Sequence, residues 1–155
     1  MTVPSAGILL YRHAVEGGLE IWIAHMGGPF WAGRQAHSWS LPKGEYQDDE
    51  DPLAAARREF TEEIGTPPPD VDYFLLGAFR QPSGKVITVF SAEESGFEPG
   101  EIVSNTFALE WPKGSGTIRD FPEIDDARWV TATDARNKLV KGQLPILDAL
   151  AGRLE

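Results

Sequence analysis

Residues 51–65 constrain the fold of this chain more than any other segment, because they specify both ends of a helix. Asp51 is a suitable N-cap, and Pro52 suits the first helical position. Gly65 is a typical helix end, and the three prolines at 67–69 prevent the helix from continuing. The sequence therefore predicts a helix that begins at Pro52 and stops at Gly65.

Two faces of this predicted helix differ in character. At 100° per residue, one apolar stripe would pack on a sheet, and its residues are Leu53, Ala56, Phe60 and Ile64. Glu59, Glu62 and Glu63 share a second face, and Ala55 leaves room beside them one turn earlier. Like charges at these spacings cost a helix roughly 0.2–0.5 kcal/mol per pair. Arg58 can reach Glu62, although the order Arg before Glu is the less favourable one.

The acidic face has two interpretations. It is either a solvated surface, as runs of charge usually are, or a site for a hard divalent cation. Clustered carboxylate oxygens suit Mg²⁺ or Mn²⁺, and such an ion would cancel their mutual repulsion. The helix alone does not decide between the two.

Strand patterns surround the helix. The predicted strands are residues 3–12, 19–26, 39–42, 72–81, 85–93, 105–111 and 127–132. Residues 16–18 join the first two strands as a hairpin, and residues 43–50 are predicted as a turn. Two closing helices are expected at 131–140 and 142–154, the first capped by Thr131 or Thr133. Many strands with few helices predict an α/β fold, a mixed sheet between helices, in one domain over residues 1–155.

Composition excludes several classes of function. The net charge of −10 argues against a broad grip on long nucleic acid, although a cation can mediate contact with a phosphorylated small molecule. The absence of cysteine excludes disulfides and thiolate metal sites. No apolar run approaches the ~20 residues of a membrane span, and the N-terminus lacks a signal-peptide pattern. We therefore expect a cytoplasmic protein with no membrane partner.

The segment from Gly44 to Thr66 decides between the two interpretations of the acidic face. It resembles the Nudix box, G-x5-E-x7-R-E-U-x-E-E-x-G-U, where U is a bulky aliphatic residue. All seven fixed positions match at the correct spacing, an outcome with a chance on the order of 10⁻⁸ per starting position. Phe60 at the first U position still packs, and Thr66 replaces the last U. The resemblance extends over most of the chain and includes residues 121–130.

Membership of the Nudix hydrolase family would imply an α/β/α sandwich with a divalent metal site in a loop–helix–loop motif. The implied metal ligands are the Gly44 carbonyl and the carboxylates of Glu59, Glu62 and Glu63, with Mg²⁺ or Mn²⁺ as the ion. Either Glu59 or Glu62 would accept the proton of the attacking water. Arg58 would pair with Glu50 and orient a glutamate.

A further carboxylate outside the helix is expected to bind metal or accept the proton. Glu123 lies just before a predicted strand, at the place where related hydrolases carry a glutamate on a mobile loop that faces the metals. We therefore predict that Glu123 is a metal ligand or the proton acceptor. The alternative is a solvated glutamate among acidic neighbours.

The substrate side is less constrained. Lys43 is predicted to contact a substrate phosphate, although an exposed turn lysine is an equal alternative, and Gly44 lets the backbone approach metal or phosphate. Tyr46, Phe30 and Trp31 lie in loops beside the site and are candidates for stacking on a base.

We rank the substrates that the resemblance allows. A nucleoside polyphosphate, either a nucleoside triphosphate or a dinucleoside polyphosphate, comes first, and ADP-ribose or a nucleotide sugar second. Removal of pyrophosphate from RNA 5′ ends comes third, because the acidic charge disfavours a long polyanion. A Nudix fold that only binds a nucleotide is the alternative to an enzyme, and the protein would be a monomer or homodimer.

Overall fold

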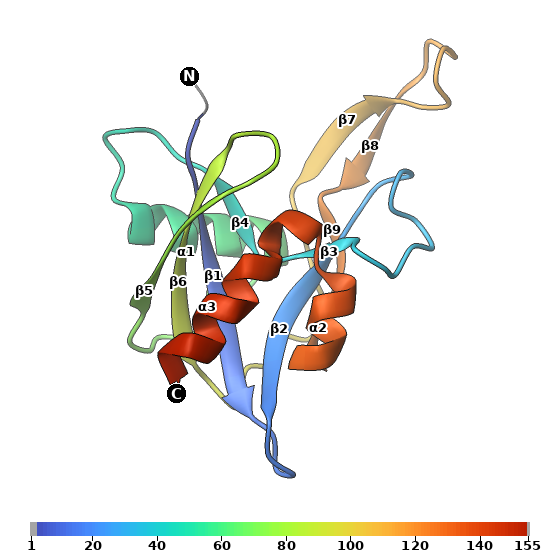
Figure 1. Ribbon diagram of the computed structural model, residues 1–155. Helices are drawn as coiled ribbons and strands as arrows, with labels where there is room; N and C mark the ends of the chain where they lie inside the picture. The colour runs from blue at the N-terminus through green and yellow to red at the C-terminus, as the bar shows by residue number, and fades with distance from the viewer. Residues whose placement is uncertain (1–2, 155) are drawn as a thin grey trace.

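The computed structural model describes residues 3–154, which build a mixed β-sheet with helices on both of its faces (Figure 1). The sheet has the order β3-β2-β1-β6-β5, with β4 paired to β1 and β9 paired to β2. Only β1 and β6 run parallel; the other pairs are antiparallel. Its strands are β1 (Ser5–His13), β2 (Leu19–Met26), β3 (Trp39–Ser40), β4 (Lys43–Glu45), β5 (Phe74–Arg80), β6 (Val86–Glu93) and β9 (Ile124–Thr131).

The helices begin and end where local chemistry dictates. The predicted acidic helix is α1 (Pro52–Ile64); Asp51 accepts a hydrogen bond from the Ala54 N–H at 3.0 Å, and Gly65 ends the helix at φ 86°. Thr131 caps α2 (Ala132–Lys138) by accepting from the Asp134 N–H. A short 3₁₀ turn, η1 (Lys141–Gln143), leads into α3 (Leu144–Leu154).

Strand β1 supplies the cores on both faces of the sheet, because successive side chains of a strand point to opposite sides. Ile8 and Leu10 pack in the cluster that includes Phe60 of α1. Leu9 packs in the other cluster, with residues of α2 and α3 such as Leu150. The structure is the α/β/α sandwich that the resemblance implied.

Three strand predictions need correction. Residues 43–45 were expected in a turn but form β4, because their backbone pairs with β1 at Ser5–Gly7. Strand β9 begins at Ile124 and not at residue 127, since β2 continues to pair with it there. Strand β8 (Ile118–Pro122) was not predicted; it pairs with β7 (Thr106–Glu110) in a separate two-stranded ribbon. Most β8 side chains are exposed, so no alternation of apolar residues indicates the strand.

The β7–β8 ribbon projects from the sheet beside the loop that follows β2 (Figure 1).

Among residues 3–154, no helix is long and apolar enough to cross a membrane.

Candidate active site

Strand β4 places Gly44 against the face of α1 that carries Glu59. Gly44 pairs with Ala6 of β1, which fixes the position of β4. A Cβ atom at Gly44 would lie 2.0 Å from Oε2 of Glu59, so the carboxylate reaches the strand only because residue 44 is glycine. The structure thus brings together two of the predicted metal ligands.

Glu63 is the most buried carboxylate of α1, with 7% of the residue exposed. Its Oε1 accepts a hydrogen bond from the Lys43 backbone N–H at 3.1 Å. Burial raises the pKa of Glu63 to about 7; Lys43 lowers it, whereas Glu123 and Glu59 raise it further. Full ionisation of the Glu63 carboxyl at neutral pH therefore requires a further positive charge nearby.

Arg58 organises the exposed side of the acidic face. Its Nε and Nη2 donate to the two carboxylate oxygens of Glu50 at 2.9 and 3.0 Å, a bidentate pair that lowers the pKa of Glu50. Its Nη1 donates to Glu59 at 2.8 Å and lies 3.4 Å from both oxygens of Glu62. The predicted Arg58–Glu50 pair is confirmed. With its guanidinium fixed by Glu50, Arg58 orients the carboxylates of Glu59 and Glu62.

Glu123 lies between β8 and β9; its place on a mobile loop, which the resemblance implied, stays a prediction. Its backbone N–H donates to the Asn105 carbonyl and its own carbonyl accepts from the Gly27 N–H, both at 2.8 Å. These two hydrogen bonds fix the backbone of Glu123, which is the single residue that separates β8 from β9. Burial raises the pKa of the Glu123 carboxyl, Lys43 lowers it and Glu62 raises it.

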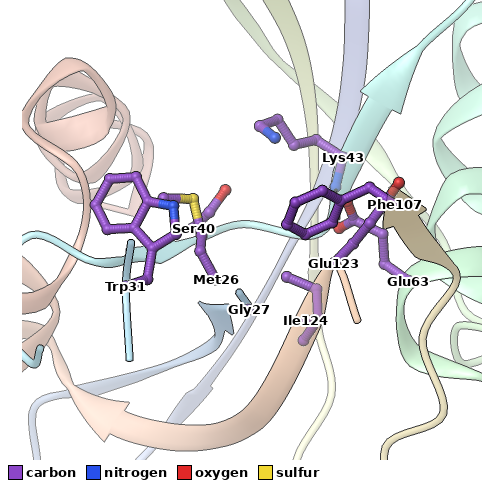
Figure 2. Close-up of a pocket in the computed structure, with 9 residues that line it drawn as sticks. All are labelled: Met26, Gly27, Trp31, Ser40, Lys43, Glu63, Phe107, Glu123 and Ile124. Carbon is purple, nitrogen blue, oxygen red and sulfur yellow. Dashed lines mark hydrogen bonds between the residues drawn. The ribbon is translucent and has the colours of Figure 1, made fainter. Parts of the chain in front are cut away.

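The predicted ligands face two adjoining cavities. The polar chamber, of about 360 Å³, is lined by Ser5, Lys43, Gly44, Glu45, Glu59, Glu62, Glu63, Lys85, Asn105 and Glu123. The apolar chamber, of about 320 Å³, is lined by Met26, Gly27, Trp31, Ser40, Lys43, Glu63, Phe107, Glu123 and Ile124 (Figure 2). Lys43, Glu63 and Glu123 line both chambers and mark their junction.

Some predicted substrate residues lie elsewhere. Tyr46 packs partly buried against the core cluster that contains Phe60, and it is absent from the lining of both chambers. Phe30 is 59% exposed and meets Trp111 of the β7–β8 ribbon edge to face, with ring centroids 5.6 Å apart. Trp31, by contrast, lines the apolar chamber. A substrate contact by Tyr46 stays a prediction.

Sequence reasoning missed several residues that line the chambers, among them Lys85, Asn105 and Phe107. Lys85 directly precedes β6 and forms an ion pair with Glu45 at 2.8 Å. The Asn105 N–H donates to the carbonyl of Glu62, which attaches this segment to α1. None of the three belongs to a local motif; their positions follow from strand pairing far along the chain.

The carboxylates of the polar chamber are of the chemical type that binds divalent cations. Burial raises the pKa of Glu59, with repulsion from Glu62 adding to the effect, as it does for Glu123. Carboxylates that destabilise one another in this way are stabilised by a shared cation, and their oxygens are hard ligands. Within residues 3–154, no three acidic or histidine side chains converge on one point. In this arrangement Arg58 competes with an ion for the oxygens of Glu59 and Glu62.

Known proteins resemble this chain over nearly its whole length. The NUDIX domain family model matches residues 1–150. The RNA pyrophosphohydrolase of Acidiphilium cryptum (strain JF-5) is 32% identical over 125 residues, which cover 75% of this chain and 71% of that protein.

Solved structures share the fold at low identity. The NUDIX domain of Shewanella oneidensis NrtR, solved with ADP ribose, has a TM-score of 0.67 and 16% identity, covering 100% of this chain and 90% of that one. An Ap4A hydrolase from C. elegans, solved as a binary complex, has a TM-score of 0.63 and 18% identity, with 97% of each chain covered. These likenesses extend the resemblance from the box to the whole sandwich.

The box residues Gly44, Glu59, Glu62 and Glu63 line the polar chamber. Nudix hydrolases generally use divalent metal ions, in agreement with the carboxylates found there. The chain belongs to the Nudix family and is a Nudix hydrolase.

Proposed function

We propose that the protein hydrolyses a diphosphate linkage in a nucleoside polyphosphate, with water attacking at phosphorus and with Mg²⁺ or Mn²⁺ as the cofactor. One observation carries the proposal: the five carboxylates and two lysines of a single polar chamber adjoin a chamber with aromatic walls. Anionic phosphates and a neutral ring system need these two environments side by side.

The carboxylates of the polar chamber would hold the ions. The proposed ligands are the Gly44 carbonyl and the side chains of Glu59, Glu62, Glu63 and Glu123. When bound, divalent ions neutralise phosphate charge and lower the pKa of a coordinated water. Arg58 keeps Glu59 and Glu62 oriented, and its own bidentate bond to Glu50 fixes the guanidinium.

Two lysines would bind the phosphate oxygens. The Lys43 side chain lies at the junction of the chambers, and Lys85 lies farther into the polar chamber beside Glu45. An ammonium group acts as a point charge with three donors, which suits phosphates that arrive in more than one orientation. Ammonium groups at two places along the chamber favour a substrate with more than one phosphate.

A carboxylate would accept the proton of the attacking water. Glu59 and Glu62 are candidates on α1, and Glu123 lines the same polar chamber from the junction of β8 and β9. We assign Glu123 a role as metal ligand or proton acceptor because its carboxylate shares this chamber with those of α1.

The test is a substrate panel with identified products. ATP, diadenosine tetraphosphate, ADP-ribose and a nucleotide sugar would each be incubated with Mg²⁺ or Mn²⁺, and products resolved by mass spectrometry. We expect turnover to be highest with a nucleoside polyphosphate, abolished by EDTA, and restored by adding either metal. Full turnover in EDTA would contradict the proposed metal role. Binding without turnover of any substrate would support a nucleotide-binding module instead.

A second candidate substrate is the 5′-triphosphate end of RNA, which the name of the Acidiphilium relative favours. The net charge of −10 opposes contact with a long polyanion. A competition between ATP and a 5′-triphosphorylated RNA of ~20 nucleotides separates the two: preferential release of pyrophosphate from the RNA would select it over the free nucleotide.

A further inference from the structure

The apolar chamber is built by two segments that contact each other at two points. A Cβ at Gly28, in the loop after β2, would lie 2.7 Å from Cζ of Phe107 on β7, so the backbone there touches the Phe107 ring. Two residues after Gly28 in the same loop, Phe30 meets Trp111 edge to face, just beyond β7. The loop and the β7–β8 ribbon therefore set each other's position.

The loop that carries Trp31 is anchored in the core. The Arg34 carbonyl accepts hydrogen bonds from Nε2 of His25 and Oγ of Ser38, each at 2.8 Å. The Arg34 guanidinium lies 5.5 Å from the centroid of the Trp31 ring. Both contacts involve Arg34, whose backbone carbonyl is fixed by His25 and Ser38 and whose guanidinium lies beside the indole at the chamber wall.

Phe107 is positioned with comparable firmness. It pairs across the ribbon with Phe121, whose ring centroid lies 6.0 Å away, and it rests on Gly28 from the other side. Glycine at 28 has φ 96°, a conformation that disfavours any side chain, so the contact surface for Phe107 stays flat. Figure 2 shows Phe107 and Trp31 at different sides of the same chamber.

Away from the junction residues Lys43, Glu63 and Glu123, the chamber offers mainly aromatic and aliphatic surface. Ser40 lines it, but its hydroxyl already donates to the Leu41 carbonyl and accepts from Nε2 of Gln143. Met26 and Ile124 complete the apolar wall. A volume of about 320 Å³ is at the lower end of the range for small-molecule pockets, which suits one ring system and not a string of bases.

We infer that Trp31 and Phe107 are the specificity-determining residues of the site, and that they recognise one nucleobase by stacking while its phosphates enter the polar chamber. This inference rests on the proposed hydrolysis of a nucleoside diphosphate linkage. Stacking on an aromatic face accepts every base, so the recognised feature is a flat ring rather than a base-edge pattern.

The first experiment measures binding without turnover. Adenosine 5′-monophosphate and ribose 5-phosphate would be titrated into the protein by calorimetry, because they differ only in the base. We expect the parent to bind the nucleotide more tightly, and Phe107→Leu and Trp31→Leu each to weaken nucleotide binding about tenfold, within the range for loss of one stacking aromatic. Ribose 5-phosphate binding should not change.

The second experiment measures hydrolysis of ATP and of 5-phosphoribosyl diphosphate, which has a diphosphate but no base. Phe107→Leu should lower kcat/KM for ATP about tenfold, mainly through KM, and leave the base-free substrate unaffected. Phe74→Leu is the matched control, because Phe74 on β5 is 52% exposed and lines neither chamber, and it should behave as the parent in binding and hydrolysis. Circular dichroism establishes that each variant is folded.

The outcomes separate this inference from the proposed function. Equal weakening of the nucleotide and of ribose 5-phosphate, or equal effects of Phe107→Leu and Phe74→Leu, would overturn the recognition role while leaving hydrolysis intact. If the parent hydrolysed neither substrate, the proposed function would fail, and the calorimetric comparison would still decide the role of Trp31 and Phe107.

Discussion

Gly44 and Glu59 are packed so closely that a single methyl group cannot be placed between them: a Cβ at position 44 would lie 2.0 Å from a carboxylate oxygen of Glu59. The glycine therefore determines where this carboxylate lies, in addition to offering its own carbonyl.

Gly44→Ala should displace Glu59 and lower kcat by at least about tenfold, because misplaced catalytic geometry costs rate steeply. Steady-state kinetics with the best substrate of the panel would measure it. Gly152→Ala is the matched control, since a Cβ there meets nothing within 4 Å. If Gly44→Ala kept the turnover of the parent, the contact between the Glu59 carboxylate and Gly44 would not be needed for activity.

Glu62→Gln should lower kcat steeply while the protein stays folded, because it keeps the shape of the side chain and removes a charge from the polar chamber. Arg57→Ala, on the other side of α1, should retain turnover. The Arg57 guanidinium lies 5.5 Å from the centroid of the Tyr73 ring, so its loss affects stability by at most about 1 kcal/mol. A comparable loss of turnover in both variants would refute the assignment of helix faces.

Glu63→Gln should change how the metal-free protein responds to pH. The folded-state pKa of about 7 exceeds the ordinary value of 4.5, so the contribution of Glu63 to stability is full below pH 4.5 and is lost as pH rises through 7. Near 1.4 kcal/mol per pKa unit, the loss is on the order of 3 kcal/mol.

Urea unfolding in EDTA at pH 5 and pH 8 tests this. The parent should lose free energy of unfolding from pH 5 to pH 8, and Glu63→Gln should lose less. Glu16→Gln, in the exposed β1–β2 turn, should show the same loss as the parent. An identical pH dependence in parent and Glu63→Gln would mean that burial does not perturb this carboxyl.

Glu123→Gln should reduce kcat by at least ~10²-fold, the lower range for loss of a general base, with little change in melting temperature. The backbone bonds to Asn105 and Gly27 do not involve the altered side chain, so the residue should keep its position. A near-normal kcat would eliminate Glu123 and direct attention to the carboxylates of α1.

The sequence was sufficient to predict α1 and its box because every determinant is local. Asp51, Pro52 and Gly65 define the helix ends, and the spacing of the glutamates defines one face. The same locality explains the correct assignment of Arg58 to Glu50, which lie eight positions apart.

The remainder of the site depends on pairing between distant segments. Phe107 reaches the apolar chamber because β7 packs its ring on Gly28, a contact that no local pattern encodes. Lys85 enters the polar chamber because β6 runs beside β1. Tyr46 was predicted from its place in a loop, and its ring packs partly buried against the core cluster that contains Phe60; its contact with a substrate stays a prediction.

Strand β1 contributes both to the candidate active site and to the two cores, and this restricts where residues can be inserted or deleted. Ala6 pairs with Gly44, while its neighbours Ile8 and Leu9 belong to opposite cores. A one-residue insertion or deletion within β1 would exchange the two sets of core side chains and shift β4 past α1 in the same event. Length changes should consequently be accepted in the hairpin after His13 and rejected before it, so a library of insertions along residues 5–18 would map the boundary between tolerant and intolerant sequence.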